Sequence, residues 1–212
     1  MNHLDQVKKY FNDLTEKHGD HFLGLDWKSP DSQDLRFQIF ADLLVMCGKK
    51  TNFSILDVGC GYGDFYGYLK RHGYKNFNYS GYDVSEKVIE VAKKKYKEGR
   101  FEIRDILTDG HPEVFDFVFC SGALTIHFVE DEDHLEFIRI MLNRMFELCK
   151  IGVGVNFLSS EVLEFLSEEA GRQPQYYYAK AEEIIGIAKK ITSRFVLRHD
   201  YHPGDFTVYL IK

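Results

Sequence analysis

The sequence of 212 residues predicts an α/β fold, in which helices cover both faces of a mostly parallel sheet of seven strands that ends in an antiparallel hairpin. Apolar runs alternate with helical patterns from residue 53 onward, which is typical of parallel strands joined by crossover helices. The C-terminal stretch TSRFVLRHDYHPGDFTVYLIK contains two β-rich runs around a Pro-Gly turn, and this pattern predicts the hairpin.

The first fifty residues predict helices. LDQVKKYFNDLTEKHG and DSQDLRFQIFADLLVMCG both carry apolar residues at helical spacing. We expect residues 1–50 to form a helical cap and residues 51–212 to form the core of the same single domain. No repeat, low-complexity segment or Pro/Ser-rich linker divides the chain.

The parallel part begins with two strand–helix units. The strand pattern FSILDVG precedes the helix pattern GYGDFYGYLKRHG, which Gly73 closes. A second strand pattern, FNYSGYDV, precedes SEKVIEVAKKKYKEG, in which Ser85 is expected to be the N-cap. Each helix would pack back on the sheet between successive strands.

Three more strands follow. RFEIRDI predicts a short third strand, and FDFVFCSGA is continuously apolar, as expected for a fourth strand that is buried on both faces. DHLEFIRIMLNRMFELCK has apolar residues at helical spacing and leads to a fifth strand, GVGVNFLSS. With the hairpin, these patterns account for seven strands.

Composition and charge exclude several classes of protein. Hydrophobic residues make up 44% and charged residues 28%, the balance of an ordinary globular protein. The net charge of -6 disfavours a general polyanion binder and so disfavours a nucleic-acid partner. No apolar stretch approaches the roughly 18 residues of a membrane span, and the start MNHLDQVKKYFNDL has no signal-peptide core. We therefore expect a cytoplasmic protein without a membrane partner.

The cysteines predict neither disulfides nor a metal site. The four cysteines are scattered, with no C-x-x-C pair and no histidine at zinc-site spacing; they are Cys47, Cys60, Cys120 and Cys149. Reduced thiols in a cytosolic protein are the expected state, and no metal is expected.

A glycine-rich loop follows the first predicted strand. In ILDVGCGYGDF, residues 55–65, Gly59, Gly61 and Gly63 alternate with other residues, although glycine costs conformational entropy. Glycines here indicate positive φ angles or close approach by a ligand. Ligands of open parallel sheets bind beyond the carboxyl ends of the strands, where this loop lies. Asp83, twenty residues beyond Gly63, ends the second strand and is placed to accept from both hydroxyls of a ribose.

The loop differs from a dinucleotide-binding loop. Counted from Gly59, the third glycine of G-x-G-x-x-G is replaced by Asp64, and counted from Gly61 it is replaced by Tyr66. An acid at this place would repel a pyrophosphate. The sequence therefore favours a ligand that has a ribose but no phosphate.

These motifs resemble those of a known superfamily. LDVGCGYGDF, GYDVSEKVIEVAKKK, RDI and FDFVFCSGA, in this order and spacing, resemble the successive motifs of class I S-adenosylmethionine-dependent methyltransferases over residues 50–160. The resemblance implies a Rossmann-like fold, S-adenosylmethionine as cofactor and methyl transfer as the reaction. WKSPDSQDLRFQIFADLL and LRHDYHPGDFTVYLIK also resemble small bacterial methyltransferase-like proteins of unassigned substrate.

The resemblance also implies roles for individual residues. The methionine part of the cofactor would lie against the three loop glycines, with Asp57 beside its ammonium group. Asp83 would bind the ribose hydroxyls, and Val84 would pack on the adenine. Asp105 would accept from the adenine amino group, and the backbone amide of Ile106 would contact the adenine ring. Ser121 and Gly122 would line the region beneath the sulfonium. Capping or turn roles for Asp57, Asp83 and Asp105 are the alternatives.

Acceptor-side residues are expected elsewhere on the same edge of the sheet. RHDYHPGDF, between the last two strands, brings Asp200, Tyr201 and His202 to that edge as candidate catalytic residues, unless it is an ordinary surface turn. His127, just past the fourth strand, is a candidate base. In related methyltransferases a segment before the first strand meets the carboxylate of the cofactor, and Arg36 is the candidate here unless it is a surface arginine.

These observations predict an enzyme that transfers a methyl group from S-adenosylmethionine to O or N of a small molecule. One alternative is an RNA or protein methyltransferase, which the acidic charge disfavours. The fourth strand also ends in CSGA rather than the N/D-P-P-Y/F motif of nucleic-acid amino-group methylation. A second alternative is a non-catalytic protein that binds S-adenosylmethionine.

Overall fold

A sheet of eight strands organises the protein, whose computed structural model describes residues 3–110, 113–164 and 173–212. The strand order is β3-β2-β1-β4-β5-β8-β7, and β6 pairs with β5 off this path. The strands are β1 (Thr51–Val58), β2 (Lys75–Asp83), β3 (Arg100–Ile103), β4 (Phe115–Cys120), β5 (Cys149–Ser159), β6 (Tyr178–Ala179), β7 (Phe195–His202) and β8 (Asp205–Ile211).

The directions of the strands confirm the predicted architecture. Strands β1 to β6 pair with one another in parallel, whereas β8 is antiparallel to both β5 and β7. Strand β6 was not among the seven predicted strands. It has only two residues, which is too short for an alternating pattern in the sequence. The order reverses at β1 and β4, so their carboxyl ends are the expected ligand site.

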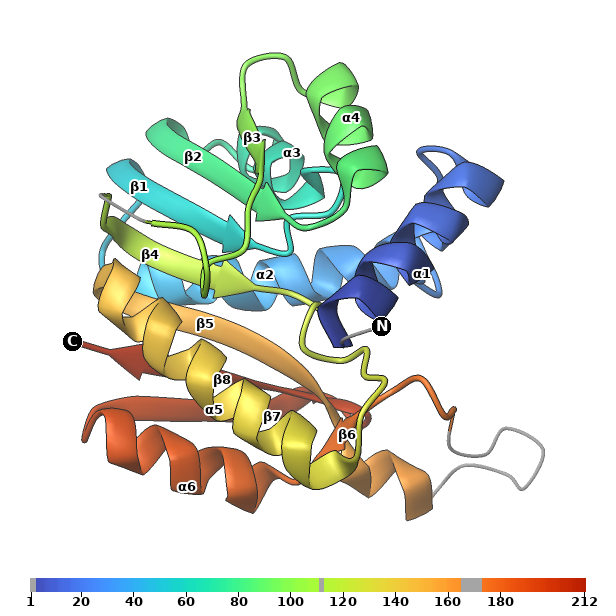
Figure 1. The fold of residues 1–212 in the computed structure, drawn as a ribbon. Coiled ribbons are helices and arrows are strands. Elements are labelled where there is room, and N and C mark those ends of the chain that lie inside the picture. The colour runs from blue at the N-terminus through green and yellow to red at the C-terminus, as the bar shows by residue number, and fades with distance from the viewer. Residues whose placement is uncertain (1–2, 111–112, 165–172) are drawn as a thin grey trace.

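Helices cover both faces of the sheet (Figure 1). One apolar core lies between the sheet and α2 (Pro30–Met46), α3 (Asp64–Arg71) and α4 (Glu86–Lys95). The other lies between the sheet and α5 (Asp131–Leu148) and α6 (Ala181–Ile191). Helix α6 was not predicted, although Ile184, Ile187 and Ala188 give it a buried stripe at helical spacing.

Side-chain caps define two helix starts beside the site. Ser29 Oγ accepts a hydrogen bond from the backbone amide of Ser32 at 3.1 Å, and Pro30 occupies the first turn of α2. Ser85 Oγ accepts from the backbone amide of Val88 at 3.2 Å, which confirms the predicted N-cap of α4. Both caps stand at the edge of the sheet where the parallel strands end.

The N-terminal segment lies over that edge. It consists of α1 (His3–His18) and the 3-10 helix η1 (Phe22–Leu25), and α1 packs against α4. The buried Tyr62 of the glycine loop holds it in place, because its hydroxyl donates to the carbonyl oxygen of Gly19 at 2.7 Å and lies 3.0 Å from Thr15 Oγ1. This N-terminal segment is thus anchored on the glycine loop. Among the described residues, no helix is long and apolar enough to cross a bilayer.

Candidate active site

The glycine loop turns sharply at the end of β1. Gly59 and Gly61 have φ angles of 68° and 56°, in the left-handed region that favours glycine. A Cβ atom at Gly59 would lie 2.3 Å from the Cβ atom of Ala123, so the loop also needs the missing side chain at this position. The backbone amides of Gly59 and Cys60 donate to the carbonyl oxygen of Tyr82 and join the loop to the end of β2. These positive φ angles confirm the first of the two predicted reasons for the glycines, and close approach by a ligand stays a prediction.

Asp57 and Asp83 flank the loop and line one cavity. Asp57 is 3% exposed and accepts a hydrogen bond from the hydroxyl of Tyr79. Burial, followed by the charges of Asp83 and Asp64, raises the pKa of Asp57 to about 7, against the opposing effect of the tyrosine hydrogen bond. Asp57 therefore changes charge near neutral pH.

Asp83 connects the loop to the start of α4. Its Oδ2 accepts from the backbone amide of Gly61 at 3.1 Å, and its Oδ1 accepts from that of Ser85 at 3.0 Å. Burial raises its pKa, and these backbone hydrogen bonds counteract the increase. These two bonds fix the carboxylate of Asp83, whose oxygens can still accept hydrogen bonds from two further donors.

The adenine-side candidates also line the cavity. Val84, Asp105 and Ile106 all belong to its wall, as the sequence analysis expects. However, the carboxylate of Asp105 already accepts from the backbone amide of Leu107 at 2.8 Å and from the hydroxyl of Thr108 at 3.0 Å. Asp105 thus caps its own turn, which was the alternative reading of this position.

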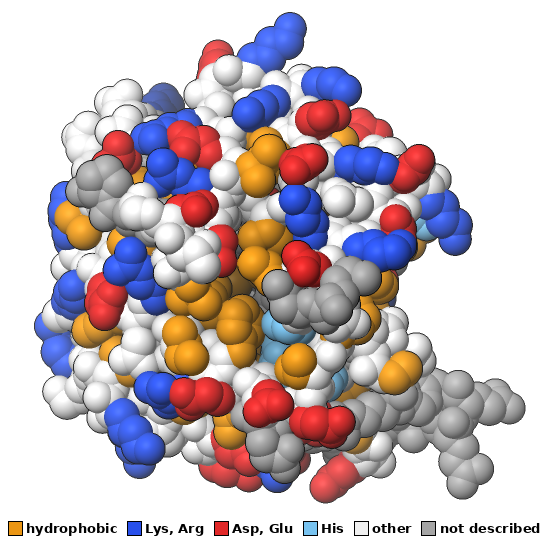
Figure 2. Space-filling model, in the orientation of Figure 1, with side chains coloured by type: hydrophobic (Ala, Val, Ile, Leu, Met, Phe, Trp, Pro, Cys, Tyr) orange, Lys and Arg blue, Asp and Glu red, His pale blue; other side chains and the backbone are white. Residues whose placement is uncertain are grey.

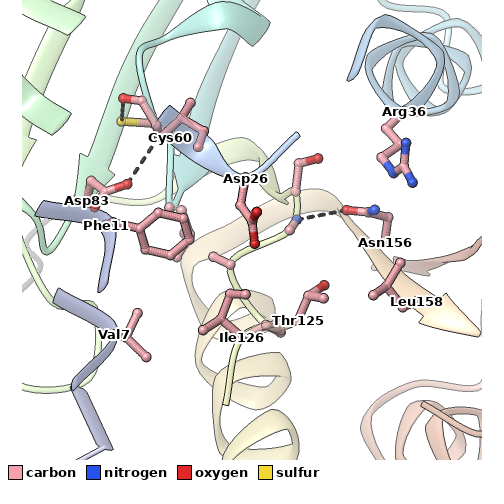
Figure 3. Close-up of a pocket in the computed structure, with 18 of the residues that line it drawn as sticks. Val7, Phe11, Asp26, Arg36, Cys60, Asp83, Thr125, Ile126, Asn156 and Leu158 are labelled. Carbon is pink, nitrogen blue, oxygen red and sulfur yellow. Dashed lines mark hydrogen bonds between the residues drawn. The ribbon is translucent and has the colours of Figure 1, made fainter. Parts of the chain in front are cut away.

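The end of β4 forms the floor of the cavity. Ser121 and Gly122 line it, and the Ser121 hydroxyl is buried without a hydrogen-bond partner among the described residues. The amide of Gly122 donates at 3.1 Å to the side-chain carbonyl of Asn156, which is buried at the end of β5 (Figure 3). A buried hydroxyl needs a hydrogen-bond partner, which a group of a bound ligand or an ordered water can provide.

Arg36 lies at the far end of the cavity from Asp83 (Figure 3). Its Nη1 donates to the backbone carbonyl and the hydroxyl of Ser32, and its Nη2 pairs with the fully buried carboxylate of Asp205. The guanidinium also stands over the Trp27 ring, 5.1 Å from its centroid. The predicted contact with a cofactor carboxylate stays a prediction; two of the three nitrogens already have partners.

His202 is the one predicted catalytic residue in the wall of the cavity. Its Nδ1 lies 2.9 Å from Asp205 Oδ2 and 3.0 Å from the amide nitrogen of Gly204, so the tautomer decides which bond forms. Asp205, which was not singled out from the sequence, contacts both Arg36 and His202.

The other three candidates lie outside the cavity wall, which corrects their expected placement. Asp200 is exposed and paired with Arg198, and the Tyr201 hydroxyl contacts Thr207 Oγ1 at 2.8 Å. Strand β7 continues to His202, and its register against β8 shifts between Arg198 and His202, so these residues lie in an irregular strand and not in a loop. His127 is buried, with Nδ1 2.9 Å from the carbonyl oxygen of Val129. We do not assign a catalytic role to these three.

The cavity has a volume of about 810 Å³ and is lined mostly by apolar side chains. Figure 2 shows hydrophobic side chains gathered around a hollow in the middle of this face, with acidic and basic side chains interspersed around it. The described basic side chains on this face (Figure 2) are mixed with acidic ones, which disfavours binding of a nucleic-acid backbone. Among the described residues, no three His, Cys, Asp or Glu side chains are grouped to hold a metal ion.

Comparisons with known proteins agree with this geometry. Residues 55–148 match the family model described as a methyltransferase domain. The Mycobacterium tuberculosis protein named "Putative methyltransferase Rv1506c" is 29% identical over 162 residues, which are 76% of this chain and 93% of that protein.

Two solved structures share the fold over almost the whole chain. Magnesium protoporphyrin IX methyltransferase from Synechocystis PCC 6803, solved with bound S-adenosylhomocysteine, is 19% identical with a TM-score of 0.70, covering 98% of this chain and 99% of that one. The plantazolicin methyltransferase BpumL is 15% identical with a TM-score of 0.68, covering 99% and 98%. Residues 55–148 thus match a methyltransferase domain, and the chain shares the fold of methyltransferases that were solved with bound S-adenosylhomocysteine.

Proposed function

We propose that the protein is an enzyme that transfers a methyl group from S-adenosylmethionine to O or N of a small molecule. The observation that carries the proposal is a single cavity lined by the glycine loop, by Asp83 and by the unpartnered hydroxyl of Ser121. This donor and acceptor set fits a ribose and a charged tail. Asp64, at the start of α3, is paired with Lys95 at 2.6 Å and would oppose a phosphate there.

The residues of the chain divide the work between binding and positioning. When bound, S-adenosylmethionine supplies an electrophilic methyl group on a sulfonium. Asp83 binds the ribose hydroxyls, Asp57 binds the ammonium group, and Val84 packs on the adenine. Holding an acceptor in line with the methyl group contributes on the order of 7–11 kcal/mol to lowering the barrier. His202, beside Asp205, is the proposed base for a hydroxyl acceptor.

A cytoplasmic location is part of the proposal. It is supported by the four cysteines, all of which are free thiols in the structure.

The function is tested by binding and then by labelling. We expect S-adenosylhomocysteine to bind the purified protein in a calorimeter, and absence of binding would refute the proposal. Incubation with methyl-labelled cofactor and a cell metabolite extract, with and without RNase and protease, then identifies the class of acceptor. Label that persists after both digestions supports a small molecule, whereas label lost with RNase or protease indicates RNA or protein.

The ionisation of Asp57 predicts how cofactor binding depends on pH. Its pKa of about 7 means that the acid is mostly protonated below pH 7 and cannot pair with an ammonium group. Affinity for S-adenosylhomocysteine is therefore expected to rise by about tenfold per pH unit toward pH 7 and to level off above it. Calorimetry from pH 5.5 to 8, in ~0.5-unit steps over this titration range, measures the slope.

Two variants test whether Asp57 causes this pH dependence of S-adenosylhomocysteine affinity. Asp57→Asn should flatten it, because the titrating group is gone. Tyr79→Phe removes the hydrogen bond that lowers the pKa of Asp57, so the midpoint should move to higher pH. The same slope in Asp57→Asn as in the natural protein would show that another group controls binding.

A further inference from the structure

A short segment after η1 connects the glycine loop to the floor of the cavity. Leu25 packs on the loop, since a Cβ atom at Gly61 would lie 2.7 Å from its Cδ1. Trp27 covers the floor, since a Cβ atom at Gly122 would lie 3.6 Å from its Cζ2. Asp26 stands between these two residues and lines the cavity, and Figure 3 shows it between Asp83 and Asn156. The segment therefore brings a carboxylate to the middle of the cavity.

Tyrosines from two distant parts of the chain hold this carboxylate. Tyr10 of α1 donates to Asp26 Oδ2 at 2.7 Å, and Tyr176, just before β6, donates to the same oxygen at 2.6 Å. Among the described residues no donor is placed on Oδ1. Asp26 also has a φ angle of 59°, the left-handed conformation of the C-cap that ends η1. Two donors fix the acid, and one oxygen remains for a ligand.

The surroundings of Asp26 suit a cation on an apolar body. Trp27, Tyr176 and Tyr178 also line the cavity. The guanidinium of Arg36 lies over the Trp27 ring, in a cation–π contact. Acids outnumber bases in the wall: the acids are Asp26, Asp57, Asp83, Asp105 and Asp205, and the bases are Lys28, Arg36 and Arg104. Two of these bases are paired with acids, Arg36 with Asp205 and Arg104 with Glu102. An anionic acceptor would therefore meet mainly negative charge.

We propose that the methyl acceptor is an amine on an apolar body, bound through its ammonium group to Asp26 Oδ1 between Trp27 and Tyr176. This inference rests on the proposed methyltransferase function and narrows the choice between O and N to N. A carboxylate beside aromatic side chains binds an ammonium group through charge-assisted hydrogen bonds.

Asp26 also serves as the proton acceptor. The ammonium transfers one proton to Asp26, and the freed nitrogen lone pair attacks the sulfonium methyl carbon. The new N–C bond forms as the C–S bond breaks, and the electron pair of the C–S bond stays on sulfur as a thioether. The product is the methylated ammonium, and Asp26 releases its proton to solvent.

Trp27 supplies a direct binding assay, because it is the single tryptophan of the chain. The protein is saturated with S-adenosylhomocysteine, and the tryptophan fluorescence is followed during titration with benzylamine, phenethylamine or hexylamine, each paired with the alcohol of the same skeleton. We expect saturable binding of at least one amine. Its matched alcohol should bind at least about tenfold more weakly.

The matched variant is Asp26→Asn, which keeps the shape and tolerates the left-handed conformation. It should weaken amine binding by about tenfold or more and leave S-adenosylhomocysteine affinity unchanged. Asp13→Asn, on the exposed face of α1, is the control and should change neither. Unchanged melting temperatures show that the variants fold.

The outcomes separate this inference from the proposed function. Failure of S-adenosylhomocysteine to bind the natural protein refutes the function itself. With that binding intact, the amine proposal is overturned if no amine binds, if the alcohols bind equally well, or if Asp26→Asn leaves amine binding unchanged. It is also overturned if Asp26→Asn reduces only S-adenosylhomocysteine affinity, because Asp26 would then bind the cofactor.

Discussion

Replacing Asp83 with alanine is expected to weaken S-adenosylhomocysteine binding by about two orders of magnitude or more. The proposed role gives this carboxylate two hydrogen bonds to ribose hydroxyls, and bonds to charged groups contribute about 1.5–3 kcal/mol each. Asp83 also accepts from the backbone amides of Gly61 and Ser85, so the alanine variant frees the glycine loop as well. Calorimetric titration measures the loss directly.

A ligand variant separates the hydroxyl contacts from the loop contacts. 5′-Methylthioadenosine and its 2′-deoxy analogue differ by one hydroxyl, so the natural protein should bind the deoxy analogue about tenfold more weakly. Asp83→Ala should bind the two equally. Glu86→Ala removes a neighbouring acid whose side chain is 62% exposed, and it should leave both affinities unchanged. A persistent difference between the two ligands in Asp83→Ala would remove Asp83 from the ribose.

The cofactor side of the site was predictable because each element depends on local sequence. A buried apolar strand followed by glycines predicts the loop after β1, and an acid at the end of the next strand lies at the same edge of the sheet. Ser85 was predictable as an N-cap because the serine comes directly before the helical pattern. In each case the residues that interact belong to consecutive elements.

The acceptor side depends on contacts that local sequence does not reveal. Asp26 follows no strand, and its tyrosine partners are 16 and 150 positions away. Asp205 directly follows the Pro-Gly turn, and its partner Arg36 is 169 positions away. Asp200 and Tyr201 read as loop residues, whereas the register between β7 and β8 shifts between Arg198 and His202. Such an irregularity redirects side chains and leaves no clear mark in the sequence.

The buried pair of Arg36 and Asp205 is expected to have the largest effect on stability. Asp205 is fully buried at the start of β8, opposite Leu158 near the end of β5, and Arg36 reaches it from α2. Arg36→Met would leave a buried carboxylate without its counter-ion, and breaking such a pair costs about 3–5 kcal/mol. For a chain of this size the melting temperature should fall by roughly 6–20 °C. Thermal unfolding followed by circular dichroism measures the change.

The double variant Arg36→Met/Asp205→Asn separates the two roles that Arg36 can have. It removes both charges, so most of the lost stability should return, and a melting temperature no higher than that of Arg36→Met would contradict the pair as the cause. If Arg36 also binds the cofactor carboxylate, as the resemblance implies, S-adenosylhomocysteine affinity should stay low in the double variant although stability has recovered. If affinity recovers together with stability, Arg36 acts only by joining α2 to β8, through its contacts with Ser32 and Asp205.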